Sequence, residues 1–232
     1  MYNIPVENIH LTHGATQALG IAIASASRGG KVAVEMPSYG PQSQTARILG
    51  LETITVRRLP TDREWIIDRE SWEEVLSQVD LITICPQLNP VGWTYTDDDR
   101  KWLIDACQRH DVRIISDEVY SGADRNWKPF FKEGDNCISI SSLTKVHGLG
   151  QIRYGWMIAS TDIIANAENT FHNMAGVMST PVIMVANRVK PRLHEPIDLI
   201  DHYREKNLPV LQECLNRLGI CLLYTSDAAD DN

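Results

Sequence analysis

Residues 137–155 read CISISSLTKVHGLGQIRYG, an apolar and serine-rich run that passes directly into a glycine-rich loop. The run from Cys137 to Ser141 has the alternation of a β-strand, and the glycines that follow indicate a loop. This loop holds Lys145, with Ser142 three positions before the lysine and Arg153 eight positions after it. Residues directly after the strands of a mostly parallel sheet are where ligands bind. The segment therefore predicts a strand that ends in a functional loop.

Similar short strands recur along the chain, with helical patterns between them. The other β-rich runs are Lys31 to Glu35, Glu52 to Val56, Leu81 to Cys85 and Val112 to Ser116. The stretch Ala15 to Ser27 has helical character, and Thr96 followed by three aspartates predicts an N-cap with an acidic first turn for a helix that ends near His110. Such alternation builds βαβ units, whose ligands bind at the carboxyl ends of the strands. We expect an α/β fold, a mostly parallel sheet flanked by helices.

The last third of the chain has a mainly helical pattern. After Thr161 the helical stretches are Ile164 to His172, Pro181 to Arg188 and Ile197 to Leu218, the last with an interruption predicted at Pro209. Residues 221–232 resemble the in-frame translation of a transposon-derived sequencing adapter, so we expect them to be no part of the natural fold. The domain expected is therefore one large domain with its following helices, residues 1–220.

Composition and charge exclude several classes of protein. The 232 residues are 43% hydrophobic and 22% charged, which is ordinary for a globular protein. No run of about 18 apolar residues and no apolar leader occurs, so we expect no spanning helix and a cytoplasmic protein. The net charge of -8 argues against nucleic-acid binding, which needs clustered Lys and Arg. Five scattered cysteines without C-x-x-C spacing favour reduced core thiols over disulfides or a metal site.

Four further segments carry polar or aromatic residues where a strand ends or a helix begins. They are Thr12 to Ala18, Met36 to Gly40, Pro86 to Gly92 and Asp117 to Tyr120. Each has an ordinary structural explanation when taken alone, such as an N-capped helix, a core aromatic residue, a proline-directed turn or a capping aspartate. Their shared position at the ends of elements favours one common binding site.

Ser142 and Lys145 also match the S-x-x-K spacing of penicillin-recognising enzymes, in which the serine is an acylated nucleophile. That class needs S-D-N and K-T-G elements, and neither tripeptide occurs in the chain. The G-x-S-x-G, P-loop and G-x-G-x-x-G motifs are also absent from the sequence. An acylated serine is therefore not expected.

Taken together and in this order, the five segments resemble the motifs of fold-type I pyridoxal-phosphate enzymes, in particular the class I and II aminotransferases. The resemblance implies that Lys145 carries pyridoxal 5'-phosphate as a Schiff base. It implies that Asp117 pairs with the protonated pyridine nitrogen and that Tyr120 donates to the phenolic oxygen of the cofactor. The catalytic residues expected are Lys145, Asp117 and Tyr120.

The same resemblance assigns the remaining cofactor contacts. The residues implied are Ala15, Thr16, Ser142 and Arg153 at the phosphate, Tyr39 stacked on the ring, and Asn89 as a second donor to the phenolic oxygen. The turn that holds Asn89 has Val91 where the family pattern has Thr. Because the implied contact belongs to the asparagine, this departure leaves the assignment in place.

The reaction implied is the transfer of an amino group between an amino acid and a 2-oxo acid, with Lys145 also moving the proton. Carbon–sulfur lyases and other eliminating relatives share the same cofactor contacts and remain an alternative. A transcriptional regulator with an aminotransferase-like sensor domain is an alternative of another class, although Asp-Glu-Val-Tyr at residues 117–120 resembles the enzymes. A scaffold without enzymatic activity is the third.

Several parts of the family pattern have no counterpart in this sequence. They are the N-terminal arm and most of the C-terminal small domain, which carries the arginine that binds the substrate carboxylate. The resemblance implies a homodimer for the full-length protein. For residues 1–220 alone we expect weak cofactor binding and little amino-group transfer, because substrate positioning contributes orders of magnitude to rate.

Overall fold

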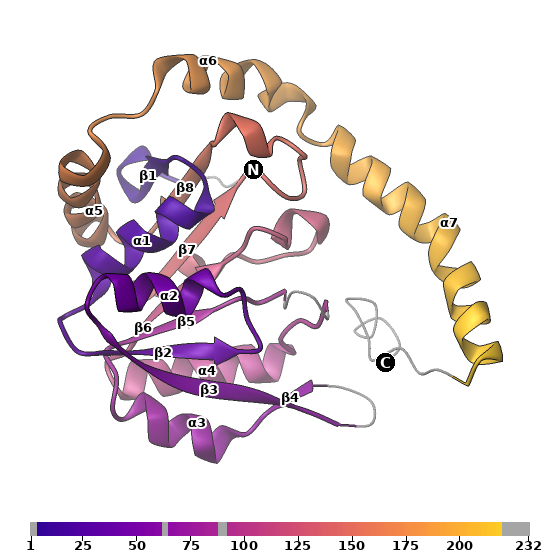
Figure 1. Ribbon diagram of the computed structural model, residues 1–232, viewed down its shortest axis with the longest axis horizontal. Coiled ribbons are helices and arrows are strands. Elements are labelled where there is room, and N and C mark those ends of the chain that lie inside the picture. The colour runs from indigo at the N-terminus through magenta and orange to yellow at the C-terminus, as the bar shows by residue number, and fades with distance from the viewer. Residues whose placement is uncertain (1–3, 62–64, 88–91, 220–232) are drawn as a thin grey trace.

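The computed structural model describes residues 4–61, 65–87 and 92–219, which form a central sheet with helices on both faces (Figure 1). Within these residues, eight strands lie in the order β1-β8-β7-β6-β5-β2-β3-β4. Their bounds are β1 Ile9–Thr12, β2 Lys31–Met36, β3 Glu52–Pro60, β4 Trp65–Ile67, β5 Leu81–Ile84, β6 Arg113–Asp117, β7 Cys137–Ser142 and β8 Gly155–Ile158. The α/β class predicted from the alternating pattern is confirmed.

The sheet is mostly parallel. Strand β2 pairs in parallel with β3 and β5, and β6 pairs in parallel with β5 and β7. Strand β8 is antiparallel to both β7 and β1, and β4 is antiparallel to β3. Because β1 therefore runs in the same direction as β7, the carboxyl ends of β1, β2, β5, β6 and β7 lie along one side of the sheet. We call this side the carboxyl edge, and it is where mostly parallel sheets bind ligands.

Helices α1 (Ala15–Ala26), α2 (Pro41–Ile48) and α5 (Thr161–Ala175) cover one face of the sheet (Figure 1). Helix α1 packs directly on β6, β7 and β8. Its buried apolar side chains are alanines, isoleucines and a leucine that belong to one core cluster with isoleucines of the strands. The small alanine side chains let the helix axis approach the sheet, which fixes where the first turn of α1 lies.

Helices α3 (Arg69–Leu76) and α4 (Asp97–Arg109) cover the opposite face (Figure 1). The core on this face includes Trp72, Leu103 and Phe130, all of them buried. The predicted N-cap of α4 is confirmed, since the hydroxyl of Thr96 accepts a hydrogen bond from the Asp99 N–H at 3.1 Å. The start of α4 is therefore fixed by local sequence as well as by packing.

Helices α6 (Thr180–Val189) and α7 (Glu195–Arg217) arch around the outside of the molecule (Figure 1). No residue of α7 is buried, and Arg125 holds this helix through ion pairs of 2.6 Å to Asp198 and Asp201. The predicted interruption at Pro209 is wrong, because α7 continues through this residue. A proline removes a single backbone hydrogen bond, and the turns on both sides of Pro209 keep theirs.

None of the cysteines that the structure describes is part of a disulfide. Cys85, Cys107 and Cys137 are buried, as predicted for core thiols, whereas Cys214 is only half-buried and Cys221 lies outside the described residues. Burial raises the pKa of the Cys137 thiol to about 12. Among the described helices, none combines the length and the apolar composition that crossing a bilayer requires.

Candidate active site

The turn between β1 and α1 presents backbone N–H groups at the carboxyl edge. Gly14 is the N-cap of α1 and has a φ of +84°, a conformation that side-chain-bearing residues rarely adopt. The Thr12 hydroxyl donates to the Gly14 carbonyl at 3.1 Å and stabilises this turn. Ala15 and Thr16 begin α1, as predicted, and first-turn N–H groups have no acceptor inside a helix. The positive end of the helix dipole therefore faces this edge and favours an anion.

Arg153 lies against the same turn. Its Nη2 donates to the His13 carbonyl at 3.3 Å, and a Cβ added to Gly14 would lie only 2.5 Å from Nη2. A Cβ added to Gly155 would lie 2.6 Å from the Gly14 carbonyl carbon, so β8 also approaches the turn closely. Gly155 is in register with Ser142 at the end of β7. The two glycines thus let the guanidinium, the serine and the start of α1 converge.

Asp117 ends β6 with its carboxyl group inside the protein. The residue is 6% exposed, and the hydrogen bond described for its carboxylate is from the Val119 N–H to Oδ1 at 3.3 Å. Burial raises the pKa of Asp117 to about 7; the Glu118 carboxylate also raises it, whereas the Val119 N–H and the charge of Lys145 lower it. A buried carboxyl group with so few donors is poised to accept a cationic partner.

Lys145 follows β7 and lies beside Tyr120, which follows β6. The Nζ of Lys145 is 6.0 Å from the centre of the Tyr120 ring. The lysine side chain is exposed, and its charge acts on the Asp117 carboxyl group. The three residues predicted to be catalytic are therefore brought together by the adjacent ends of β6 and β7, which are neighbours in the sheet.

Glu118, which the sequence analysis did not single out, lies between Asp117 and Tyr120 in the chain and fixes the position of this segment. Its Oε1 accepts hydrogen bonds from the Ser139 hydroxyl at 2.6 Å and the Phe130 N–H at 2.8 Å, and its Oε2 accepts one from the Trp127 indole at 3.2 Å. Burial raises the pKa of Glu118. A charged residue at the end of an apolar strand, directly after Asp117, is the signal that could have identified this anchor.

Two predicted site residues remain, Tyr39 on the other half of the carboxyl edge and Asn89 outside the described residues. Tyr39 follows β2, is 45% exposed and accepts the Gln42 N–H at its carbonyl at 2.9 Å. Among the described residues, no hydrogen bond or ring contact joins Tyr39 to Lys145 or Asp117. Asn89 lies outside the described residues. Their predicted contacts therefore remain predictions.

A family model described as aminotransferase class I and II matches residues 2–190 of the chain. This match covers well over half of the sequence. The chain belongs to the class I and II aminotransferase family. Its likeness to pyridoxal-phosphate enzymes, inferred from five short motifs, is confirmed by a match that extends over all eight described strands and to the end of α6.

Curated relatives of this aminotransferase-family chain are longer than the chain itself. It is 30% identical over 154 residues to a probable aminotransferase, TAT1, of Arabidopsis thaliana, which covers 65% of the chain and 33% of that protein. It is 27% identical over 168 residues to the histidinol-phosphate aminotransferase of Yersinia pestis strain Pestoides F, which covers 69% of the chain and 42% of that protein. The chain spans less than half the length of these curated relatives.

Solved structures of pyridoxal-phosphate enzymes share the fold. A PLP-bound putative aminotransferase from Clostridium difficile 630 superposes with a TM-score of 0.84 at 20% identity, over 93% of this chain and 59% of that one. The PLP-bound C-S lyase from Staphylococcus hominis superposes with a TM-score of 0.81 at 19% identity, over 92% of this chain and 56% of that one. At these identities the likeness shows the fold alone.

The residues of this aminotransferase-family site fit pyridoxal phosphate, the cofactor of the family. The helix start beside Gly14 and the Arg153 guanidinium supply donors for a phosphate, and the poorly solvated Asp117 carboxyl group lacks a cation that a pyridine ring could provide. No group of three metal-ligating side chains gathers anywhere in the residues that the structure describes. The donor set therefore matches an anionic ring cofactor.

Proposed function

We propose that this chain binds pyridoxal phosphate at the carboxyl edge, with Lys145 as the residue that forms the covalent Schiff base. The observation that carries the proposal is the position of the Lys145 amine, which lies beside the Tyr120 ring and whose charge acts on the buried Asp117 carboxyl group, a group with a pKa raised to about 7. An acid with few hydrogen-bond donors, an exposed amine and a phenol at adjacent strand ends are the groups that hold a protonated pyridine ring and bond to its aldehyde.

The phosphate of the cofactor binds at the turn between β1 and α1. Its ligands are the Ala15 and Thr16 backbone N–H groups, the Ser142 hydroxyl and the Arg153 guanidinium. The contact of Arg153 with Gly14 and the pairing of Ser142 with Gly155 support this assignment, since they bring a cation and a hydroxyl to a positive helix end.

Residues from both halves of the carboxyl edge would hold the ring of the cofactor. Asp117 would bind the protonated ring nitrogen, Tyr120 and Asn89 would donate to the phenolic oxygen, and Tyr39 would stack on the ring. The exposed position of Tyr39 at the end of β2 is compatible with a stacking role.

The reaction proposed is amino-group transfer between an amino acid and a 2-oxo acid. The cofactor supplies the electron sink for this reaction when it is bound, and the Lys145 amine moves a proton at the substrate carbon. The proposed setting is the cytoplasm, with a homodimer as the complete form. Because the chain spans less than half of its curated relatives, we also propose that it transfers amino groups slowly by itself.

The decisive experiment is covalent trapping. The chain is incubated with pyridoxal phosphate and reduced with borohydride, and the labelled lysine is identified by peptide mapping. We expect the label on Lys145. Lys190, which lines the same cavity of about 410 Å³ as Ser142, is the internal control. Label on Lys190 instead, or no label at saturating cofactor, contradicts the proposal.

A carbon–sulfur lyase activity is the second candidate, because a C-S lyase from Staphylococcus hominis shares the fold. The two activities differ in their products. A transferase converts added 2-oxo acid into an amino acid, whereas a lyase releases a thiol and ammonia from a sulfur-containing amino acid without a 2-oxo acid. Measuring both products with one protein preparation separates the two candidates.

A further inference from the structure

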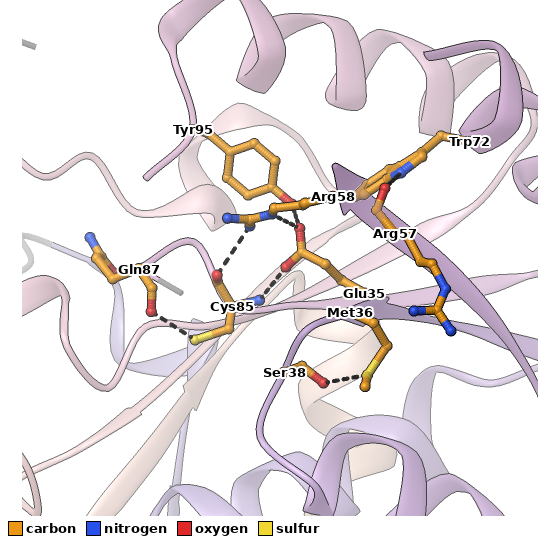
Figure 2. Close-up of polar contacts among 9 residues, drawn as sticks. All are labelled: Glu35, Met36, Ser38, Arg57, Arg58, Trp72, Cys85, Gln87 and Tyr95. Atoms are coloured by element: carbon orange, nitrogen blue, oxygen red, sulfur yellow. Dashed lines mark hydrogen bonds and ion pairs between the residues drawn. The ribbon is translucent and has the colours of Figure 1, made fainter. Parts of the chain in front are cut away.

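A buried ion pair lies on the other half of the carboxyl edge (Figure 2). The Arg58 Nε donates to Glu35 Oε1 at 2.5 Å, and the Tyr95 hydroxyl donates to the same oxygen. Both charged side chains are 0% exposed. Burial alone would lower the pKa of Arg58, but the charges and hydrogen bonds of Glu35 and Tyr95 together raise it. The three residues come from β2, β3 and the segment before α4, so the network joins parts of the chain that are distant in sequence.

This network binds the backbone of Cys85, the first residue after β5. The Cys85 N–H donates to Glu35 Oε2 at 3.1 Å, and the Cys85 carbonyl accepts from Arg58 Nη2 at 3.2 Å. Strand β5 ends at Ile84, so these two peptide groups lie beyond the paired strand. Beyond the strand, the side chains of the ion pair bind the Cys85 N–H and carbonyl groups, as a neighbouring strand would within the sheet. These bonds fix the direction in which the chain leaves β5 (Figure 2).

The same network binds the other end of the segment between β5 and α4. The Arg58 guanidinium lies 4.0 Å from the centre of the Trp93 ring and 4.2 Å from that of Tyr95. Both aromatic residues are buried, and Thr96 follows them as the N-cap of α4. The stems Cys85–Gln87 and Trp93–Tyr95 are thus fixed to each other through one guanidinium.

Stability alone is a weak explanation for this arrangement. Two charges lose their hydration on burial, and a well-packed apolar replacement of such a pair is often at least as stable. The Arg58 Nη1 is buried without a hydrogen-bond partner in the described part of the chain, so the desolvation of this guanidinium is incompletely compensated. What an apolar replacement cannot supply is the pair of directed hydrogen bonds to the Cys85 peptide.

We propose that Glu35, Arg58 and Tyr95 are positioning residues for the cofactor site. They fix the stem that leaves β5 and the end of β2, on which Glu35 precedes Tyr39 by four residues. Their effect on cofactor binding rests on the proposed function, whereas their effect on the stems does not. The network acts through Cys85 and the end of β2 and itself makes no contact with the cofactor.

The test measures the stems and the cofactor separately. Hydrogen–deuterium exchange of peptides that span residues 81–87 is followed without cofactor, and pyridoxal-phosphate affinity is titrated on the same preparations. The variants are Arg58→Lys, Tyr95→Phe and the paired apolar replacement Glu35→Leu with Arg58→Met. We expect the paired variant to fold, to exchange the Cys85 amide about tenfold to a hundredfold faster, and to bind cofactor about tenfold more weakly.

Arg58→Lys separates charge from geometry. A lysine keeps the positive charge beside Glu35 but cannot donate to both the carboxylate and the Cys85 carbonyl in the planar arrangement of a guanidinium. We therefore expect faster exchange in this variant as well. Tyr95→Phe removes one hydroxyl and is expected to give a smaller change in the same direction. Wild-type exchange in the lysine variant and the paired variant overturns the proposal.

The control is Arg100→Met with Glu133→Leu, a partly buried ion pair of 2.8 Å on the same face of the sheet. Arg100 also lies over an aromatic ring, that of Phe130, at 4.1 Å, but it does not bind Cys85. Its removal should leave exchange at residues 81–87 unchanged, and an equal increase there contradicts a specific role of the network. If the wild-type chain binds no pyridoxal phosphate, the proposed function fails, and the exchange data alone decide whether the network positions the stems.

Discussion

Among the carboxyl groups buried at the carboxyl edge, Glu35 on one half and Asp117 on the other differ in what surrounds them. Glu35 on β2 accepts hydrogen bonds from Arg58, Tyr95 and the Cys85 N–H, so both of its oxygens are bound. Asp117 on β6 has one described hydrogen bond, from the Val119 N–H at 3.3 Å. Both residues are in strand-end positions and both are almost inaccessible to water.

The difference separates a carboxylate that holds the chain from one that is available to a ligand. A buried anion with three donors and an adjacent cation is compensated within the protein. Asp117 is not compensated in this way, and burial raises its pKa to about 7. Asp117 has few hydrogen-bond donors and no ion-pair partner among the described residues, so it is the buried acid to which a cationic ring nitrogen can bind.

The largest expected effect concerns Lys145, which belongs to the Asp117 half of the comparison. We expect Lys145→Ala to abolish the visible absorbance band of lysine-bound pyridoxal phosphate, because the amine that forms the covalent bond is lost. Absorbance after cofactor addition, followed by gel filtration, measures this. Lys190→Ala is the control and should keep the band. A band that survives in Lys145→Ala would show that another lysine binds the cofactor, and the proposed role of Lys145 beside Asp117 would be wrong.

The second prediction concerns the compensated half. Arg58→Met leaves the Glu35 carboxylate buried without its cation and should destabilise the fold by about 3–5 kcal/mol. The paired replacement Glu35→Leu with Arg58→Met should cost much less, since no isolated charge remains. Urea unfolding of the wild type, of Glu35→Leu and Arg58→Met singly, and of the paired variant gives the coupling energy between the two side chains. Additive losses would mean that the two side chains stabilise the protein independently.

The third prediction uses the raised pKa of Asp117. The folded state binds a proton more tightly than the unfolded chain, whose Asp pKa is 3.8, so stability should fall as pH rises from there to about 7. Asn does not titrate, so Asp117→Asn should be more stable than the cofactor-free wild type at about pH 8, by roughly 2–4 kcal/mol. Thermal unfolding across pH measures this difference, which should vanish at low pH.

The control for this pH dependence is Asp105→Asn, an exposed carboxylate on α4. This variant should follow the wild-type pH profile. Pyridoxal phosphate should stabilise the wild type more than Asp117→Asn, because only the wild type offers a counter-ion to the ring nitrogen. Parallel pH profiles for the wild type and Asp117→Asn would show that the buried carboxyl group is already compensated, and the contrast with Glu35 would then fail.

The smallest effect expected is at the phosphate end of the site. Gly14→Ala and Gly29→Ala each introduce a side chain at a positive φ, +84° and +85°, so each should lose about 1–3 kcal/mol of stability through strain. Only the Cβ at Gly14 would also collide with Arg153, whereas Gly29 has nothing within 4 Å. Cofactor titration should therefore show about tenfold weaker binding for Gly14→Ala alone. Equal cofactor affinities in Gly14→Ala and Gly29→Ala would show that Arg153 does not bind the phosphate.

Much of the sheet could be predicted, because its central strands are marked by local pattern. All five predicted strands occur within one or two residues of their bounds, apart from β3, which extends to Pro60. The elements that were missed are short or atypical, namely α2, α3, β4 and β8. Strand β8 follows the lysine loop directly and forms through pairing with β1 and β7, which a local pattern does not show.

The candidate site was predictable in its residue types but only partly in its geometry. The spacing of Ser142, Lys145 and Arg153 follows the chain, so sequence alone could identify them. The neighbours of these residues depend on strand order, since Asp117 meets Lys145 only because β6 lies beside β7. The anchoring role of Glu118 was missed because its donors, Trp127, Phe130 and Ser139, lie 9 to 21 residues further along the chain.

The sequence by itself determined the strand ends, the start of α1 and the residues that carry amine, phenol, carboxyl and guanidinium groups, since these depend on local periodicity and capping. Only the tertiary structure decided which buried acid is compensated. Glu35 is separated from Arg58 by 23 residues, from Cys85 by 50 and from Tyr95 by 60, and these groups meet through the order of β3, β2 and β5. Solvation of a charge depends on everything packed around it, and neighbours in space are fixed by the folded sheet and not by position along the chain.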